Sequence, residues 1–413
     1  MRSINIIFLC IYALIACNYA KREPRFAPYL FMGRSQDVHL VQYKQQTGIS
    51  GFTLAFALAG GGACNPMWDG TIPIDEPNLV NELKAFKAAG GNYIVATGGA
   101  AGVYLENACG SAANLQAAYK KILDVTGATG LDIDVEATIP VDTVMEALAG
   151  LQRQNPSITV SFTLRVIGDD YGVTDLNVIQ SAAKHGVDVD AVNPMAMDFG
   201  KSPKSKTWGD AVVNTGDSVV RQMKTIWPQK SDPELYSMLG ITPMIGLNDV
   251  GMIFELDHAR QLVKYAIDKG VGHLAFWSIN RDKPCSAGGP VFADPGCSSI
   301  PQQVLEFTKI FMEYDRHNHT DPTPGPTPPP GPTPDPHTKT PVPTSPPGPT
   351  TPFTMDCTET GRQYPDMNDC SVYYVCDHQK PVREVCSPGE LYNTDSKNCD
   401  YADKVKTIRP ECR

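Results

Sequence analysis

The stretch TGLDIDVEA, residues 129–137, alternates acidic and apolar side chains. Asp132, Asp134 and Glu136 occupy every second position, and in a β-strand such positions point to the same side. In an antiparallel sheet that side commonly faces water. A strand of a parallel barrel has no such face, because one side packs on helices and the other points into the barrel. The surrounding fold therefore decides whether these acids form a solvated surface or a site.

The chain around this stretch alternates short β-prone runs with amphipathic helical patterns. The predicted strands are residues 29–32, 51–58, 93–99, 130–136, 158–166, 191–199, 241–247 and 273–278. Segments with apolar residues at three-to-four spacing lie between them, for example 76–90, 112–125, 141–154 and 257–270. This alternation predicts an α/β fold, the (β/α)8 or TIM barrel. A doubly wound open sheet is the alternative, but no Gly-x-Gly-x-x-Gly motif follows the first strand.

Inside a barrel, the three acids would repel one another unless they share protons. Sharing raises the pKa of at least one carboxyl group. Glu136 comes last, at the carboxyl end of its strand, where barrel enzymes hold their reacting groups. We therefore predict that Glu136 stays protonated near neutral pH and acts as a general acid.

The composition indicates several domains and a secreted product. The chain has 413 residues and a formal net charge of -10, which is long for one domain and too acidic to favour nucleic acid as a partner. Residues 1–20 combine a basic start, a short apolar run and a small residue before Lys21, as in a signal peptide. No later segment is apolar enough to cross a membrane. The barrel domain is assigned to residues 21–315.

A proline- and threonine-rich segment separates the barrel from the end of the chain. Residues 319–352 have almost no apolar side chains for a core, and their prolines favour an extended polyproline II conformation. We assign 316–354 to a linker with O-glycosylated threonines and 355–413 to a second domain. Asn318 also begins an N-glycosylation sequon.

Cysteine usage agrees with an oxidising compartment. Of 12 cysteines, Cys10 and Cys17 lie in the leader, which leaves an even set that we predict to form disulfides. Those of the barrel region are Cys64, Cys109, Cys285 and Cys297, and those of the second domain are Cys357, Cys370, Cys376, Cys386, Cys399 and Cys412. No Cys-x-x-Cys pair occurs, so a zinc site is disfavoured, and we expect neither a metal nor a cofactor. Spacing alone does not choose the pairing.

Several segments resemble glycoside hydrolase family 18, the chitinases and their relatives. Residues 130–136 are similar to its Asp-Gly-x-Asp-x-Asp-x-Glu signature, and 97–99 to its Ser-x-Gly-Gly segment. Residues 195–198 resemble its Met-x-Tyr-Asp segment, and Trp277 falls at the tryptophan of its eighth strand. The segments GFTLAFALAGGGACNPMWDG, MAMDFG and TPMIGLND look like the bacterial-type branch. The resemblance covers almost all of 26–315.

This resemblance implies a retaining hydrolysis in which the substrate supplies the nucleophile. Glu136 would protonate the glycosidic oxygen while the N-acetyl oxygen of the sugar attacks the anomeric carbon, forming an oxazolinium ion. Asp134 would orient the acetamide N–H, with Asp132 holding the shared proton behind it. Asp198 would contact the acetamide or the reacting sugar, and Trp277 would form the floor of that subsite.

The sequence departs from the family pattern at three positions. Thr129 replaces the leading Asp, Ala96 the Ser and Met197 the Tyr of the quoted segments. Ala96 removes a hydroxyl that would help to satisfy the buried Asp132, and Met197 contacts substrate without donating to the acetamide oxygen. We interpret these changes as features of a subgroup.

The groove is expected to be open. Many animal relatives carry an extra α+β module between the seventh and eighth strands. Residues 249–273 leave room for only one helix there. An open groove favours internal cleavage of a polymer.

The second domain resembles the peritrophin-A type of chitin-binding domain, on its cysteine spacing and on CSVYYVC and ELYNTDSKNCDYADKV. That family implies the pairs Cys357–Cys376, Cys370–Cys412 and Cys386–Cys399. Tyr374 and Tyr392 are predicted to stack on sugar rings. A disulfide-rich module that binds protein is the alternative.

Together these features predict a secreted, monomeric endochitinase that acts on chitin and chitin oligosaccharides. The C-terminal module would raise the effective concentration of the barrel at insoluble chitin. Two alternatives remain. One is a catalytically silent chitin-binding lectin, and the other is an endo-N-acetylglucosaminidase acting on glycoproteins.

Overall fold

The computed structural model describes residues 25–199, 205, 207–286 and 292–317, and in the C-terminal part 363–366, 370–377, 380–386, 390–394, 398–401 and 405. The chain divides into two compact units, residues 1–325 and 326–413. The predicted signal peptide, the linker and the Asn318 sequon lie outside the described residues. None of the described helices is both long and apolar enough to span a bilayer.

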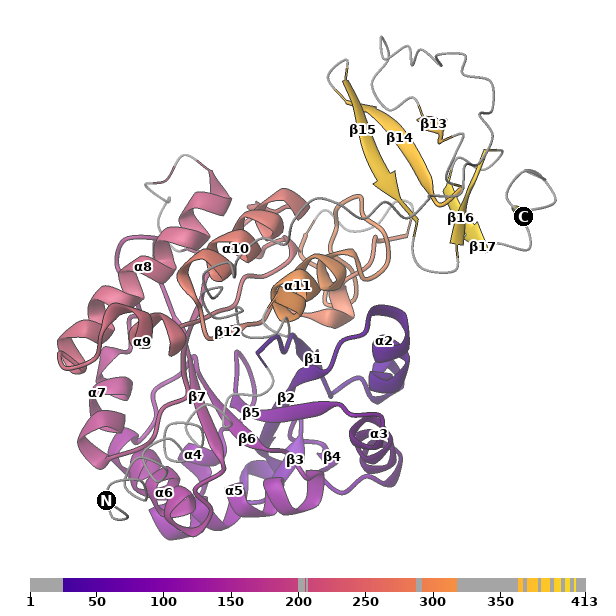
Figure 1. Ribbon diagram of the computed structural model, residues 1–413. Coiled ribbons are helices and arrows are strands. Elements are labelled where there is room, and N and C mark those ends of the chain that lie inside the picture. The colour runs from indigo at the N-terminus through magenta and orange to yellow at the C-terminus, as the bar shows by residue number, and fades with distance from the viewer. Residues whose placement is uncertain are drawn as a thin grey trace, which may run out of the picture. The chain divides into compact units, whose positions relative to one another are not determined.

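The first unit is a closed parallel barrel (Figure 1). Its strands are β1 (Tyr29–Phe31), β2 (Gly51–Ala59), β5 (Asn92–Gly98), β6 (Gly130–Val135), β7 (Thr159–Arg165), β8 (Ala191–Met195), β9 (Gly240–Ile241) and β12 (His273–Leu274). Single parallel bridges join β8 to the β9 segment, and β9 pairs with β12. The ring closes where the Ala27 N–H donates to the Leu274 carbonyl at 3.0 Å and the Tyr29 N–H to the Phe276 carbonyl at 3.1 Å. The predicted (β/α)8 barrel is confirmed.

Helices surround the strands. They are α2 (Leu40–Thr47), α3 (Pro77–Ala88), α5 (Ala112–Thr126), α6 (Val141–Gln154), α7 (Leu176–His185), α8 (Trp208–Ile226), α10 (Leu256–Lys269) and α11 (Glu306–His317), with short turns α4 (Leu105–Ala108) and α9 (Asp232–Ser237). On β6, the apolar residues Leu131, Ile133 and Val135 belong to the barrel's hydrophobic core. The apolar half of the quoted stretch therefore anchors β6, and its acidic half is directed into the barrel.

Local sequence signals set the ends of the helix that leads into β6. The Ser111 hydroxyl accepts a hydrogen bond from the Asn114 N–H at the start of α5. At its end, Gly127 adopts a left-handed conformation with φ +74°, which a residue without a Cβ reaches easily. These two signals place Gly130 at the first position of the strand.

Three strands are shorter than predicted. β8 ends at Met195, and Asp198 has φ +44°, which an extended strand does not contain. β9 and β12 have two residues each, and only isolated bridges, such as Met244 with Trp277, continue them. The chain leaves the ladder here because these segments bend to line the mouth of the barrel. α11 reaches His317, past the predicted domain end at 315.

Two disulfides tie loops of the barrel unit. Cys64 pairs with Cys109, at the end of α4, and Cys285 pairs with Cys297. The sequence identified these cysteines without their pairing.

In the second unit, Cys370, Cys376 and Cys386 are disulfide-bonded. Their expected partners Cys357 and Cys412 lie outside the described residues, as does the side chain of Cys399. The pairing implied by the peritrophin-A resemblance therefore stays a prediction.

The second unit contains two small antiparallel sheets. They comprise β13 (Gln363–Pro365), β14 (Val372–Asp377) and β15 (Lys380–Val385), and β16 (Glu390–Asn393) with β17 (Asn398–Tyr401). The surroundings of Tyr392 contradict the prediction that this residue stacks on a sugar ring. Its side chain is 1% exposed, its hydroxyl donates to Gln363 Oε1 at 2.9 Å, and its ring stacks on Tyr373 at 4.5 Å. A ring enclosed in this way has no face for a sugar. Tyr374 is half-buried and donates to Asp366 at 3.1 Å.

Candidate active site

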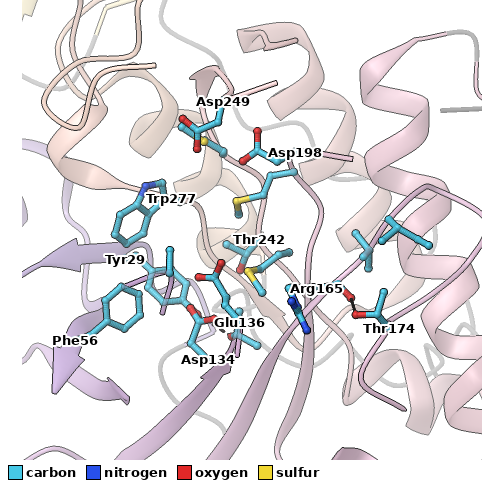
Figure 2. A pocket seen from close by; sticks show the side chains of 17 residues that line it. Tyr29, Phe56, Asp134, Glu136, Arg165, Thr174, Asp198, Thr242, Asp249 and Trp277 are labelled. Carbon is cyan, nitrogen blue, oxygen red and sulfur yellow. Dashed lines mark hydrogen bonds between the residues drawn. The ribbon is translucent and has the colours of Figure 1, made fainter. Parts of the chain in front are cut away.

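A cavity of about 560 Å³ lies at the carboxyl ends of the barrel strands (Figure 2). Its lining includes five of the predicted site residues: Asp134, Glu136, Met197, Asp198 and Trp277. Asp132 does not line the cavity and lies one residue pair deeper on β6. The structure thus gathers residues from three separate segments of the sequence at one opening.

The acids of β6 differ in burial. Asp132 is 1% exposed and Asp134 is 4% exposed, whereas Glu136 follows the end of the strand and is half-buried. The Glu136 N–H donates to the Tyr104 hydroxyl at 3.1 Å, and that hydroxyl donates to the Gly99 carbonyl at 2.6 Å. The backbone at Glu136 is therefore fixed by the segment that follows β5.

Hydroxyl groups surround Asp132. Ser161 Oγ lies 2.5 Å from Asp132 Oδ1, Thr163 Oγ1 lies 2.9 Å from the same oxygen, and the Tyr29 hydroxyl lies 2.8 Å from Oδ2. Burial raises the pKa of Asp132 to about 6, and the hydrogen bonds from Ser161, Tyr29 and Thr163 oppose this rise. The hydroxyl missing at Ala96 is therefore replaced from other strands.

Sequence reasoning missed these hydroxyl groups. A signal was present on β7, because polar residues occupy every second position from Thr159 to Arg165, so Ser161 and Thr163 share one side of the strand. Tyr29 gave no comparable signal, since an aromatic residue in a strand is ordinary core.

Asp134 lacks such partners. Its Oδ1 is buried and has no hydrogen-bond partner among the described residues, and none of their hydrogen bonds joins it to Asp132. Burial, followed by the charges of Glu136 and Asp132, raises the pKa of Asp134 well above its usual range. Donors around Asp132 favour its ionised form, so a proton held by the two acids is favoured on Asp134. The expectation that Asp132 holds the shared proton while Asp134 orients the acetamide stays a prediction.

Glu136 is set up as a proton donor. Burial raises its pKa, Arg165 lowers it, and the carboxylates of Asp198 and Asp249 raise it further. The net direction is upward, which increases the protonated fraction near neutral pH.

An aromatic wall forms one side of the cavity. The Trp277 ring stacks on Phe56 with centroids 5.8 Å apart and planes 20° apart, and it lies 6.0 Å from Tyr29. Trp277 is only half-buried and lines the cavity. An indole face fixed by packing is a suitable surface for the apolar face of a sugar ring.

The segment after β8 supplies Met197 and Asp198. The Val250 N–H donates to Asp198 Oδ1 at 3.2 Å, and the Asp198 N–H donates to Asn248 Oδ1 at 3.4 Å. Burial raises the pKa of Asp198. The loop between β10 (Gly246–Leu247) and β11 (Ile253–Phe254) therefore positions this carboxyl group.

Arg165 is a cavity residue that sequence reasoning missed. It is the last residue of β7, lines the cavity and is exposed, and its Nη2 lies 3.2 Å from Asp175 Oδ2. Figure 2 shows Arg165 and the Trp277–Phe56 pair on opposite sides of Glu136. The available signal was a cation at the carboxyl end of a predicted barrel strand, where functional side chains concentrate.

A closed barrel whose buried carboxyl groups lead up one strand to an acid at its mouth defines a barrel hydrolase. Among solved structures, the chain is similar to active domain 2 of the thermostable chitinase from Pyrococcus furiosus, a catalytic-site mutant complexed with chito-oligosaccharides. The two are 37% identical, with a TM-score of 0.67, over 72% of this chain and 96% of that one. The chain therefore belongs to glycoside hydrolase family 18.

Two curated proteins are also similar to the barrel. A probable bifunctional chitinase/lysozyme of Escherichia coli (strain K12) is 28% identical over 315 residues, 70% of this chain. Endochitinase 11 of Metarhizium anisopliae is 28% identical over 278 residues, 63% of this chain. The matches span 34% and 53% of these relatives' own lengths. Residues 357–412 match the family model described as the Chitin binding Peritrophin-A domain, as the resemblance implied.

Proposed function

We propose that this protein is a secreted chitinase that cleaves β-1,4-linked N-acetylglucosamine polymers internally. The observation that carries the proposal is the pair formed by Asp134 and Glu136. Asp134 is a buried carboxyl group with one oxygen that lacks a hydrogen-bond partner among the described residues, and it lies two residues before the half-buried Glu136 on the same side of the chain. When the Asp134 side chain turns toward the cavity, that oxygen can accept the N–H of an N-acetyl group.

The mechanism follows from the protonation states of the two acids. Glu136 gives its proton to the glycosidic oxygen as the bond to the leaving sugar breaks. The carbonyl oxygen of the bound sugar's own N-acetyl group attacks the anomeric carbon, which makes an oxazolinium ion and leaves Glu136 ionised. Glu136 then removes a proton from a water molecule that attacks the anomeric carbon, the bond from that carbon to the N-acetyl oxygen breaks, and the acetamide is regenerated. Two successive displacements leave the product with its original configuration.

Asp134 supports the charged intermediate from below. An acetamide that attacks through its oxygen becomes positive at nitrogen, and a nearby carboxyl oxygen that accepts its N–H stabilises that charge. Asp198 reaches the same cavity from β8, and the Trp277 face holds the distorted sugar. Met197 lines the cavity and contributes apolar contact only.

The connection between β9 and β12 supports internal cleavage. It contains only the short strands β10 and β11 and helix α10, and so builds no additional wall beside the cavity. A polymer can enter such a groove along its length. The early products of a soluble polymer should therefore be a mixture of long oligosaccharides.

Secretion and targeting rest on other features. The leader-like residues 1–20 and the disulfides Cys64–Cys109 and Cys285–Cys297 fit an oxidising compartment. The peritrophin-A domain would hold the enzyme on insoluble chitin, with residues 318–354 as the tether. One barrel carries all of the proposed catalytic residues, so we expect a monomer.

The test compares the full chain with its Glu136→Gln form on a soluble chitin oligosaccharide and on chitin beads. The substitution should lower kcat at least about 1000-fold because it removes the proton donor, while bead binding is kept. Glu146→Gln, on the exposed side of α6, is the matched control and should retain full activity.

Bead binding without turnover by the unaltered chain would instead identify a chitin-binding lectin. Turnover of glycoprotein glycans in place of chitin oligosaccharides would identify an endo-N-acetylglucosaminidase. Either outcome would overturn the proposal.

A further inference from the structure

Asp132 lies between two residues of opposite character. On one side of β6, β5 places Ala96 directly opposite Asp132, and on the other side β7 places Ser161 there. Ala96 has no hydrogen-bonding side chain, so all donation to Asp132 from neighbouring strands comes from β7. Both positions are buried, Ala96 completely and Ser161 to 7% exposure.

The protons of the surrounding hydroxyl groups can be assigned. Ser161 Oγ contacts only Asp132 among the described side chains, at 2.5 Å, so its proton points to that carboxylate. The Tyr29 hydroxyl donates to Asp132 Oδ2. Thr163 Oγ1 accepts from Asn193 Nδ2 at 2.9 Å and also lies 2.7 Å from the Tyr29 hydroxyl, so its own proton has two acceptors, Asp132 and Tyr29. Ser161 is therefore the hydroxyl whose proton is committed to Asp132.

This arrangement extends across the barrel interior. Asn193 is oriented in turn, because its Oδ1 accepts from Thr242 Oγ1 at 2.9 Å. Thr163 is consequently held by three side chains, Asp132, Asn193 and Tyr29. Among the described side chains, Ser161 hydrogen-bonds to Asp132 alone. Ser161 is the donor whose removal changes Asp132 with the least disturbance elsewhere.

We propose that Ser161 is a positioning residue for hydrolysis, supplying from β7 the donor to Asp132 that position 96 on β5 lacks. By keeping Asp132 ionised, Ser161 keeps the proton of the pair on Asp134 and so holds Asp134 ready below Glu136. The inference rests on the proposed function for its effect on rate, but the contact with Asp132 can be tested without it.

The experiment uses the full chain with Ser161→Ala, Ser161→Ala combined with Ala96→Ser, and Ser181→Ala. Ser181 is the matched control, since it is also a buried serine, and its hydroxyl donates to a carboxylate, Asp142, at 2.7 Å on the outer helices. The readouts are kcat and KM on a soluble chitin oligosaccharide, the pH profile of kcat/KM, and Tm at pH 4 and pH 7.

Ser161→Ala should lower kcat about tenfold with KM changed less than about twofold. The loss of a donor raises the pKa of Asp132, so the acidic limb of the profile should move to higher pH by about one unit. Ala96→Ser should restore both quantities in part, because its hydroxyl approaches Asp132 from the opposite strand. Ser181→Ala should leave both unchanged.

Unchanged kcat and an unchanged acidic limb in Ser161→Ala would overturn the inference. The inference would also be overturned if the double variant lost as much kcat as Ser161→Ala alone, because such a loss would come from a packing defect and not from a missing donor.

Thermal stability separates this inference from the proposed function. If the unaltered chain is inactive on chitin oligosaccharides, the proposed function fails, and the stability measurement still tests the contact. The loss of Tm in Ser161→Ala should be about twice as large at pH 7, where Asp132 is ionised, as at pH 4, where it is protonated. Equal losses at the two pH values would contradict the assigned donation.

Discussion

Two buried carboxyl groups of the barrel unit, Asp282 and Asp134, differ in the hydrogen-bond donors that surround them. At the start of α11, Asp282 is 1% exposed and accepts hydrogen bonds from the Thr308 N–H at 2.7 Å, the Thr308 hydroxyl at 2.6 Å and the Phe307 N–H at 3.1 Å. Gln302 Nε2 adds a further donor at 2.7 Å. On β6, Asp134 is 4% exposed, and its Oδ1 finds no hydrogen-bond partner in the part of the chain that the structure describes.

The difference separates a structural role from a chemical one. Burial raises the pKa of Asp282 as it does that of Asp134, so burial alone does not distinguish them. The donors do. Asp282 joins the loop after β12 to α11 and stabilises the fold, whereas Asp134 has a buried oxygen that no described donor satisfies, which costs stability and fits a chemical role.

The largest effect is expected for Asp134→Asn. The amide preserves the shape but cannot release a proton and become negative, so it gives the positively charged intermediate less stabilisation, and kcat should fall about 100-fold to 1000-fold. Hydrolysis of a soluble chitin oligosaccharide measures this loss. Asp282→Asn, the comparison variant, should retain kcat in its folded fraction. An equal loss of kcat in the two variants would show that Asp134 and Asp282 do not differ as a chemical and a structural carboxyl group.

Stability should respond to pH in the same comparison. The folded chain keeps a proton on Asp134 at pH values where the unfolded chain, with an ordinary pKa near 3.8, has lost it. The free energy of unfolding contributed by this group therefore declines as pH rises above about 4. Asp134→Asn should flatten that decline in chemical unfolding between pH 4 and pH 7. An unchanged slope would mean that Asp134 ionises normally.

Asp282→Ala should be the most destabilising single change. It leaves the N–H groups of Phe307 and Thr308 without their acceptor in a buried position, at an expected loss of about 3 kcal/mol of unfolding free energy. Urea unfolding measures this loss. If Asp282→Ala costs less than Asp134→Asn, the assignment of structural and chemical roles would have to be exchanged.

Arg165→Gln should produce a smaller change, in the pH profile alone. The guanidinium group lowers the pKa of Glu136, so its removal should raise that pKa and shift the alkaline limb of kcat/KM upward by about half a pH unit. Arg153→Gln, at the exposed end of α6, is the control. A downward shift would show that Arg165 acts on Glu136 in another way.

The smallest effect is expected in the second unit, for Tyr392→Phe. The change removes the hydrogen bond to Gln363 from a buried ring and should cost about 1 kcal/mol of stability, with binding to chitin beads unchanged. Tyr374→Ala provides the contrast, because Tyr374 is half-buried and remains a predicted binder. Loss of binding in Tyr392→Phe while Tyr374→Ala binds normally would reverse this assignment.

Much of the barrel could be read from the sequence because its signals are local. The alternation in residues 130–136 and the helical spacing in 112–125 and 141–154 correspond closely to β6, α5 and α6. The segments 191–199, 241–247 and 273–278 were overestimated. Met197, Met244 and Trp277 of these segments line the cavity at the mouth of the barrel and lie outside the regular strands, and periodicity does not distinguish these two uses.

Within the site, the sequence by itself determined which acids stand on one side of one strand, and that Glu136 comes last. Only the tertiary structure decided where the proton lies. Asp132 takes its donors from Tyr29, Ser161 and Thr163, which lie 29 to 103 residues away in the chain, and strand register alone brings them together. Hydrogen bonds across neighbouring strands leave no period in the sequence, so the state of Asp134 could be read only from the folded barrel.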